Sequence, residues 1–209
     1  LYKDAIYQHL GRRYMSIELD LEKKLCRVET VDVDYYTEAV WDNRIEMTEV
    51  DEETELRSAP LSFGAVHVVI QPKLYKKIRE RTYENVGYGP ITLAPFEYDT
   101  TGFALLAPPD WKSAMDAKDK RWLGSALFGL ATLLRRVAPA LCMSDAQDIE
   151  TDVSLKEEEA LRWKSALYLY DKSEGGIGYA EKIFERMEES LDLCRRVLRE
   201  CECDAGCPA

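Results

Sequence analysis

Three cysteines close to the end of the chain are the residues whose type and spacing best support a chemical role. They are Cys201, Cys203 and Cys207, with Gly206 before the last of them and Pro208 after it. Thiolates are soft zinc ligands, and short cysteine spacings with a glycine turn can bring sulfur atoms to a Zn–S distance of ~2.3 Å around one tetrahedral ion. The sequence therefore predicts a zinc site made by Cys201, Cys203 and Cys207.

Two alternatives bear on this prediction. A disulfide would also explain the cluster, but disulfides are rare in cytoplasmic proteins and a bridge across one intervening residue is strained, so a metal is favoured. A closed structural zinc site also needs a fourth ligand. The candidates are Cys194, His9, His67 and a residue after Ala209. Cys26, Cys142 and Cys194 are isolated on apolar faces, where burial in the core is the simplest interpretation.

The glycine-rich loop between Asp171 and Gly178 could expose backbone amides to a phosphate before a predicted helix. It lacks the lysine and the hydroxyl of a P-loop, and a tight strand-to-helix turn requires glycine equally. Asp171 is expected to cap this turn rather than to act in catalysis. A cysteine with His9 or His67 could form a hydrolytic pair, but no spacing supports one. We therefore predict no catalytic and no cofactor-binding residue.

Strands are predicted in the first half of the chain, where apolar and polar side chains alternate. The predicted strands cover residues 15–19, 25–33 with an extension to 37, 45–50 and 65–71, and residues 75–86 are expected to continue in an extended or hairpin-like way. Residues 91–96 and 101–107 are expected to form two further strands or one long bent strand, with an acidic loop at 51–55 and a turn at 87–90. Tyr35, Tyr36 and Tyr98 could stack on single-stranded bases. Half-buried sheet positions favour tyrosine in any case, so packing is the stronger interpretation.

Two main helices are predicted in the second half. Apolar residues spaced by three or four from Leu123 to Leu141 form one helical face, and Pro139 is expected to end or bend this helix near Ala138. Residues 166–171 are typical of a buried strand that ends in Asp171. The second helix follows the glycine loop. Its apolar face is Ile177, Ala180, Phe184, Met187, Leu191, Cys194 and Leu198.

The fold class that these elements predict is α+β. A small, barrel-like β module is expected at residues 1–55. Residues 56–209 are expected to form a mixed, mostly antiparallel sheet with two main helices and a C-terminal cysteine knuckle.

Composition narrows the functional class. The 209 residues are 46% hydrophobic and 32% charged, as in ordinary globular proteins. No continuous apolar stretch approaches the ~20 residues of a membrane span, and no signal-peptide pattern opens the chain, so a cytoplasmic protein without a membrane partner is expected. The net charge of −11 argues against this segment being the main DNA-binding surface, because self-sufficient binders are usually basic. Basic clusters at residues 73–81, 135–136 and 195–196 are expected to be solvated faces. Both ends are expected to be cut from a longer protein.

The chain resembles the C-terminal zinc-binding domain of superfamily-2 helicases of the mitomycin repair factor A type. Most of its length carries the resemblance. The matching segments are Ala5 to Gly11 with Tyr14, Asp20 to Glu22, Asp32 to Thr37, Gly87 to Gly89, Phe96 to Thr101, Arg136 to Pro139, Tyr170-Asp171, Gly175 to Gly178, Ala180-Glu181, and the terminal Cys201, Cys203 and Cys207. The cysteine cluster with the preceding glycine loop is the most specific part.

In that family the domain follows two RecA-like motor domains, four cysteines hold zinc, and the proteins are ATP-driven DNA helicases associated with repair. The resemblance implies a non-catalytic accessory region that engages DNA through its parent helicase, with the motor domains in cis as partners. Cys201, Cys203 and Cys207 would be zinc ligands. ATP and Mg²⁺ would bind only on the missing motor domains, because no P-loop and no acidic motor motif occurs here. No small-molecule substrate is expected. The alternative is a protein-interaction or scaffolding domain in a repair or phage-defence complex, which the acidic charge favours.

Overall fold

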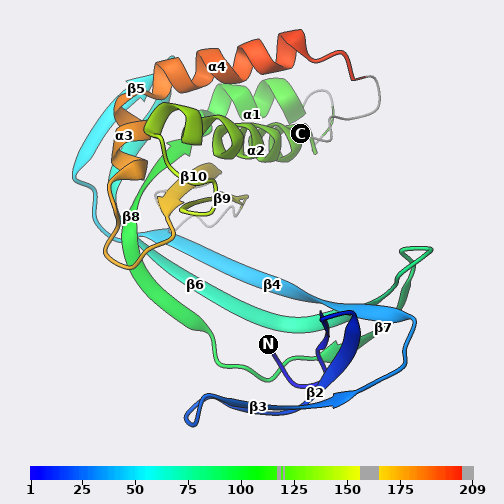
Figure 1. Ribbon diagram of the computed structural model, residues 1–209. Coiled ribbons are helices and arrows are strands. Elements are labelled where there is room, and N and C mark those ends of the chain that lie inside the picture. Colours follow the sequence, from blue (N-terminus) through cyan, green and yellow to red (C-terminus); the bar gives the residue numbers. More distant parts are fainter. Residues whose placement is uncertain (117–118, 120, 156–164, 204–209) are drawn as a thin grey trace. The chain divides into compact units, whose positions relative to one another are not determined.

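The computed structural model describes residues 1–116, 119, 121–155 and 165–203, in which a run of strands is followed by helices that flank two further strands in the sequence (Figure 1). The elements are β1 (Ile6–His9), β2 (Arg12–Asp20), β3 (Leu25–Thr30), β4 (Tyr35–Met47), β5 (Glu52–Leu56), β6 (Ala59–Arg79), β7 (Asn85–Pro90), β8 (Phe96–Leu106), α1 (Pro109–Asp116), α2 (Trp122–Cys142), β9 (Ile149–Ser154), β10 (Ala166–Asp171), α3 (Tyr179–Glu185) and α4 (Met187–Glu200).

The strands form two sheets. One is three-stranded in the order β1-β2-β3, and the other is seven-stranded in the order β4-β6-β8-β10-β9, with β5 and β7 each paired to β6. The pairings within β1-β2-β3, those of β10 with β8 and β9, and those of β5 and β7 with β6 are antiparallel. The predicted α+β class with a mostly antiparallel sheet is confirmed.

Two compact units are interleaved along the chain. The first, here called unit 1, comprises Leu1–Arg44 and Val69–Glu97, and unit 2 comprises Ile45–Val68 and Tyr98–Ala209. β4, β6 and β8 each contribute residues to both units. Tyr2, Ala5, Tyr75 and Ile91 form a small buried hydrophobic cluster in unit 1. The domain boundary near residue 55, with domains at 1–55 and 56–209, stays a prediction.

The core of unit 2 lies between the sheet and its helices. α2 contacts β9, β10, α3 and α4, and it buries Leu134 completely beside Leu167 and Leu169 of β10. Of the two outcomes predicted at Pro139, an end or a bend of the helix, the end is wrong, because α2 continues through Pro139 to Cys142. Proline in a helix removes a backbone donor and crowds the preceding turn. Burial of Ala138 and Cys142 on either side of Pro139 favours the helical continuation despite that cost.

By length and composition alone, α2 is long and apolar enough to cross a membrane. The helix has 21 residues, and a third of its most apolar window is buried inside the structure. Core helices of folded domains meet the same criteria of length and composition, and this helix places Leu123, Leu127 and Leu134 in the core cluster.

Three segments differ from the predicted strands and turns. The predicted acidic loop at 51–55 is wrong, because Glu52–Leu56 pairs with β6; exposed glutamates are common on edge strands. The predicted turn at 87–90 is also strand, in which Gly89 stands opposite Tyr75. A Cβ on Gly89 would lie 2.2 Å from the Tyr75 ring, so this glycine permits a close approach rather than a turn. Residues 91–95 are not strand, and β8 begins at Phe96.

Candidate metal centre and arginine-lined cleft

α4 leads directly into the predicted zinc ligands. Its first turn carries Glu188 and Glu189 and its last turn Arg199, an order that suits the helix dipole. The helix ends at Glu200, and Cys201 adopts an extended backbone whose N–H donates to the Val197 carbonyl at 3.1 Å. Cys201 and Cys203 are both exposed. Cys207 lies outside the described residues, so the three-cysteine site stays a prediction.

The donor chemistry of the described part of this cluster fits zinc. Two accessible sulfur atoms separated by one residue follow a helix end, which is how short cysteine spacings present thiolates to one ion. Within residues 1–116, 119, 121–155 and 165–203, no group of three or more His, Cys, Asp or Glu side chains is placed to hold a metal ion. A complete site would therefore need residues outside those ranges.

Cys194 is poorly suited to be the fourth ligand. It is only 2% exposed and belongs to the unit 2 core, and burial raises the pKa of its thiol to about 11. Zinc binds the thiolate, which this environment disfavours. Cys194 also lies seven positions before Cys201, or ~10 Å along the helix axis. The expectation that Cys194 and Cys142 are core residues is confirmed, whereas Cys26 is only half-buried.

The two histidines have different surroundings. His9 is exposed at the end of β1 in unit 1. His67 lies on β6, and its Nδ1 is 2.8 Å from Asp99 Oδ1.

Asp171 organises the glycine loop before α3. Its buried carboxylate accepts hydrogen bonds from the N–H groups of Ile177 at 2.7 Å, Gly178 at 2.8 Å and Ala180 at 2.9 Å. These amides are the ones that a phosphate would need, so the loop is already filled by an anion of the chain itself. The capping role predicted for Asp171 is confirmed.

The second predicted helix is divided in two. α3 ends at Glu185 and α4 begins at Met187, because Arg186 leaves the helical region at φ −108° and ψ 27°. Arg186 Nη1 donates to the Leu141 carbonyl at 2.7 Å, which ties this break to the end of α2. The predicted apolar face holds in its middle but fails at its ends, where Ile177 and Leu198 are exposed.

The three tyrosines considered for base stacking are not equivalent. Tyr98 is buried, and desolvation by burial raises the pKa of its phenol. Tyr35 and Tyr36 are half-buried at the start of β4. The Lys77 ammonium lies 5.3 Å from the centroid of the Tyr35 ring, a cation–π contact. Burial therefore removes Tyr98 from the stacking candidates and leaves Tyr35 and Tyr36.

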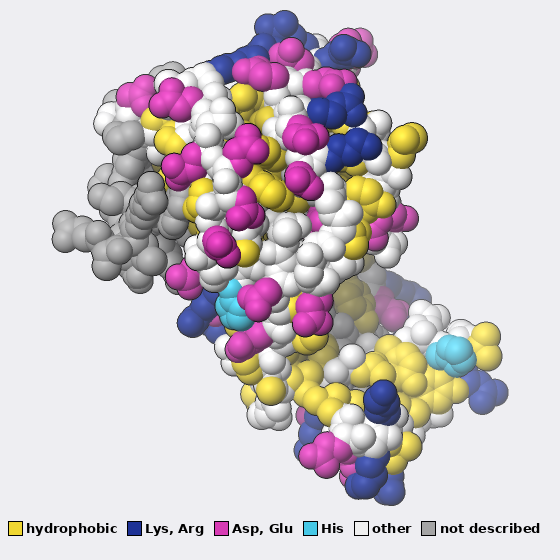
Figure 2. All heavy atoms as spheres, turned by 90° about the vertical axis from the view of Figure 1, so that its left-hand side faces the viewer, with side chains coloured by type: hydrophobic (Ala, Val, Ile, Leu, Met, Phe, Trp, Pro, Cys, Tyr) yellow, Lys and Arg dark blue, Asp and Glu magenta, His cyan; other side chains and the backbone are white. Residues whose placement is uncertain are grey.

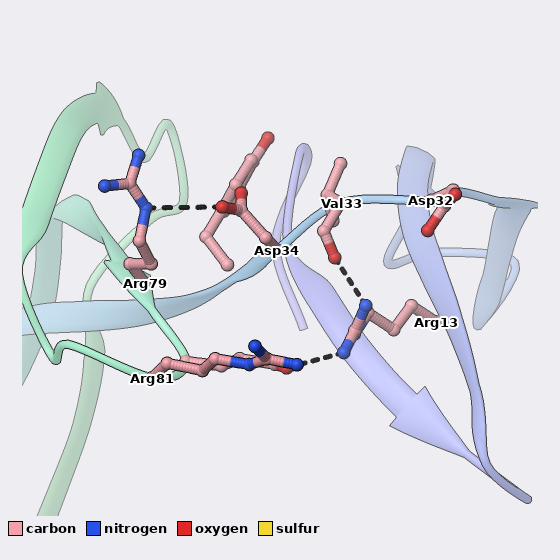
Figure 3. A pocket seen from close by; sticks show the side chains of 8 residues that line it. Arg13, Asp32, Val33, Asp34, Arg79 and Arg81 are labelled. Carbon is pink, nitrogen blue, oxygen red and sulfur yellow. Dashed lines mark hydrogen bonds and ion pairs between the residues drawn. The ribbon is translucent and has the colours of Figure 1, made fainter.

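An open cleft of about 630 Å³ that no sequence motif predicts lies within unit 1 (Figure 3). Its walls come from β2, from the segment leading into β4, and from the end of β6 with the turn after it. The lining residues are Arg13, Asp32, Val33, Asp34, Tyr35, Arg79, Glu80 and Arg81. The basic run at residues 73–81 is the part of the cleft that can be recognised in the sequence. Arg13, Asp32 and Asp34 are distant from it in sequence, and only the folding of the chain brings them to the same cleft.

Figure 2 shows acidic and basic side chains on the same face of unit 2. Some charged side chains of unit 2 form ion pairs, such as Arg57 with Glu188 at 2.7 Å and Arg135 with Glu150 at 2.8 Å. The basic clusters expected at 135–136 and 195–196 are thus partly neutralised, since Arg195 also pairs with Asp192.

Comparison with known proteins places this geometry in context. Residues 130–209 match the family described as the MrfA Zn-binding domain. The whole chain is 32% identical to the ATP-dependent helicase YprA of Bacillus subtilis and spans 27% of that protein. It is 25% identical to the ATP-dependent helicase HRQ1 of Saccharomyces cerevisiae, of which it spans 20%. It also superimposes on 27% of the crystal structure of helicase MrfA bound to DNA, with a TM-score of 0.73 and 32% identity over the full chain.

Proposed function

We propose that the chain is the accessory C-terminal region of an ATP-dependent DNA helicase and helps to engage DNA, in keeping with the match of residues 130–209 to the family described as the MrfA Zn-binding domain. The observation that carries this proposal is the match of the full chain to helicase MrfA bound to DNA, at 32% identity and a TM-score of 0.73. The chain spans about a quarter of that protein and of YprA, so ATP hydrolysis is assigned to the remainder of the parent. DNA repair in the cytoplasm is the proposed setting.

The residues of this chain support a non-catalytic role. ATP hydrolysis needs a phosphate-binding loop with a lysine and a hydroxyl. Among the described residues, the glycine-rich loop before α3 is filled by the Asp171 carboxylate. That carboxylate accepts hydrogen bonds from two N–H groups of the loop and one of the first turn of α3. A loop in this state offers no cradle for the phosphates of ATP.

Zinc is proposed as a structural ion held by Cys201, Cys203 and Cys207, with a fourth ligand beyond Ala209. When bound, the ion would supply a coordination cross-link that fixes the chain leaving α4. The chain's own contribution is to end α4 at Glu200 and to present Cys201 and Cys203 in an exposed, extended segment.

Two measurements on the purified chain test the proposal. ATP turnover should be absent with and without DNA, and robust DNA-stimulated hydrolysis would overturn the non-catalytic assignment. Binding of single-stranded DNA should weaken as salt rises, since phosphate contacts release counterions with a slope of about −0.7 per contact. A chain that binds no DNA at low salt would overturn the DNA-engaging role.

A protein-interaction domain is the second candidate. The observation that favours it is the acidic strand β5, on which Glu52, Glu53 and Glu55 are all exposed. Charged strands of this kind resist unspecific pairing but can attract a basic partner surface. The test is to replace Glu52, Glu53 and Glu55 by glutamine. A variant that loses binding to a protein partner but keeps its affinity for DNA would support this role for β5.

A further inference from the structure

The charged side chains of the unit 1 cleft fall into two pairs and a remainder. Arg13 forms an ion pair with Glu80 at 2.6 Å and also donates to the Val33 carbonyl. Arg79 forms an ion pair with Asp34 at 3.2 Å (Figure 3). Among the described residues, neither Arg81 nor Asp32 has a hydrogen bond or an ion pair, although both line the cleft. One guanidinium and one carboxylate therefore remain available to a ligand.

The two existing pairs fix the walls that carry these available groups. Arg13 of β2 reaches the segment before β4 and the turn after β6, so three separate stretches of chain are joined by one side chain. The Glu80 N–H also donates to the Asp34 carbonyl at 3.0 Å, which holds the two stretches together through the backbone. Arg81 and Asp32 are each next in sequence to a residue bound in this way. Their backbones are therefore positioned before any ligand arrives.

An aromatic ring lines the same cleft. Tyr35 follows Asp34 in sequence, and the Lys77 ammonium covers its ring at 5.3 Å from the centroid. Rings of this kind stack on nucleobases without strong sequence preference. The cleft volume of about 630 Å³ falls in the range of ~300–1,000 Å³ typical of small-ligand pockets.

We propose that this cleft holds one unstacked nucleotide of a DNA single strand. Arg81 binds its phosphate, Tyr35 stacks on its base, and Asp32 accepts a hydrogen bond from an exocyclic amino group, as carboxylates do with cytosine. The inference rests on the proposed DNA-engaging function and specifies the residues that carry it.

The charge balance of the cleft selects this ligand over two others. Duplex DNA carries one charge per ~1.7 Å and would need several available cations, whereas Arg81 alone can neutralise a single phosphate. An acidic peptide offers no amino group to the Asp32 carboxylate and would leave the Tyr35 ring unused. A single nucleotide uses the guanidinium, the ring and the carboxylate together.

The first test measures the phosphate contact. Binding of a fluorescein-labelled oligodeoxycytidylate of about ten nucleotides is followed by anisotropy at several salt concentrations. Arg81→Ala should weaken binding and reduce the salt slope by ~0.7, the value expected for one single-strand phosphate contact. Arg27→Ala is the matched control, because Arg27 is an exposed arginine of unit 1 on β3 that does not line the cleft. It should leave the slope unchanged.

The second test measures the base contacts. Tyr35→Ala should weaken binding of oligodeoxycytidylate ~5-fold or more, and Tyr35→Phe should retain it because the ring is kept. An abasic oligonucleotide of equal length should bind the wild-type chain and Tyr35→Ala equally. Asp32→Ala should abolish any preference for oligodeoxycytidylate over oligodeoxythymidylate, since thymine offers no exocyclic amino group.

The outcomes separate this inference from the function on which it rests. If wild-type chain binds DNA but Arg81→Ala and Arg27→Ala behave alike, the cleft assignment is wrong and the DNA-engaging role survives. If Tyr35→Phe loses as much affinity as Tyr35→Ala, stacking is wrong. If wild-type chain binds no single strand at low salt, the proposed function fails and the cleft assignment fails with it.

Discussion

The carboxylate of Asp171, the last residue of β10, accepts a hydrogen bond at 2.9 Å from the backbone N–H of Ala180 in the first turn of α3. The same side chain accepts from Ile177 and Gly178, and it is completely buried. The buried strand β10 and the helix α3 that follows it are therefore joined through one aspartate. This relationship makes Asp171 a structural residue whose loss has a measurable cost.

Asp171→Ala should lower the free energy of unfolding by ~3 kcal/mol or more, because it leaves three N–H donors without their acceptor in a buried site. Urea denaturation followed by circular dichroism measures the change. The matched control is Asp51→Ala, at an exposed aspartate of the same unit, which should change stability by less than ~0.5 kcal/mol. Equal effects of the two substitutions would show that the capping bonds contribute nothing.

Much of this region could be predicted from the sequence, because its signals are local. The aromatic run ending in Asp171 indicates a buried strand, and the glycines after it indicate a turn into a helix. The break between α3 and α4 at Arg186 is not predicted, because the apolar spacing from Ala180 to Cys194 continues across it. The break is accompanied by a hydrogen bond from Arg186 to the Leu141 carbonyl of α2, which is not visible in the sequence.

The unit 1 cleft could not be predicted, because its walls are brought together by pairing between distant segments. Arg13 and Glu80 lie 67 residues apart, and their ion pair depends on where β6 ends relative to β2. β7 was mistaken for a turn for a similar reason, since Gly89 is required by the Tyr75 ring on the neighbouring strand. The cysteine cluster is the opposite case, in which spacing alone predicts the chemistry but its last member lies outside the described residues.

Gly176→Ala should destabilise the chain more than Gly175→Ala. Both glycines adopt positive φ, +78° at Gly175 and +76° at Gly176, so alanine costs ~1–2 kcal/mol of backbone strain at either position. At Gly176 the added Cβ would also lie 2.1 Å from Thr101 Oγ1, whereas at Gly175 it meets nothing within 4 Å. Thermal unfolding of the two variants measures the difference, and equal melting temperatures would contradict it.

Ser58→Gly should stabilise the β5–β6 hairpin. Leu56 pairs with Ala59, and the two turn residues between them, Arg57 and Ser58, have φ of 51° and 70°. A two-residue turn with both φ values positive favours glycine at its second position, so the gain should be ~1 kcal/mol. Ser58→Ala keeps the strain and is the matched control. Arg57 is left in place because it pairs with Glu188 at 2.7 Å.

Alkaline pH should destabilise unit 2. Burial raises the pKa of the Cys194 thiol to about 11 and that of the Tyr168 phenol to about 12, so both groups keep their protons in the folded state at pH values where the unfolded chain releases them. Stability from Cys194 is full below the ordinary thiol pKa of 9.0 and is lost as pH rises from there toward 11. The urea concentration at the unfolding midpoint should fall as pH rises from 8 to 11. When each protein is normalised to its own midpoint at pH 8, the fall should be less steep in Cys194→Ala than in the wild type. Parallel curves would contradict the assignment.

Zinc content should depend on Cys201 and Cys203 but not on Cys194. The first two thiols are exposed beyond the end of α4, whereas Cys194 is 2% exposed in the core and its raised pKa disfavours the thiolate that zinc requires. Metal analysis of a protein that includes the residues after Ala209 should give one zinc ion per chain in the wild type and in Cys194→Ala. Cys201→Ser and Cys203→Ser should each lower that content, because removal of one ligand typically weakens a four-ligand site severely. Loss of zinc from Cys194→Ala, in a variant that still unfolds cooperatively, would make Cys194 a ligand and would require the end of α4 to open.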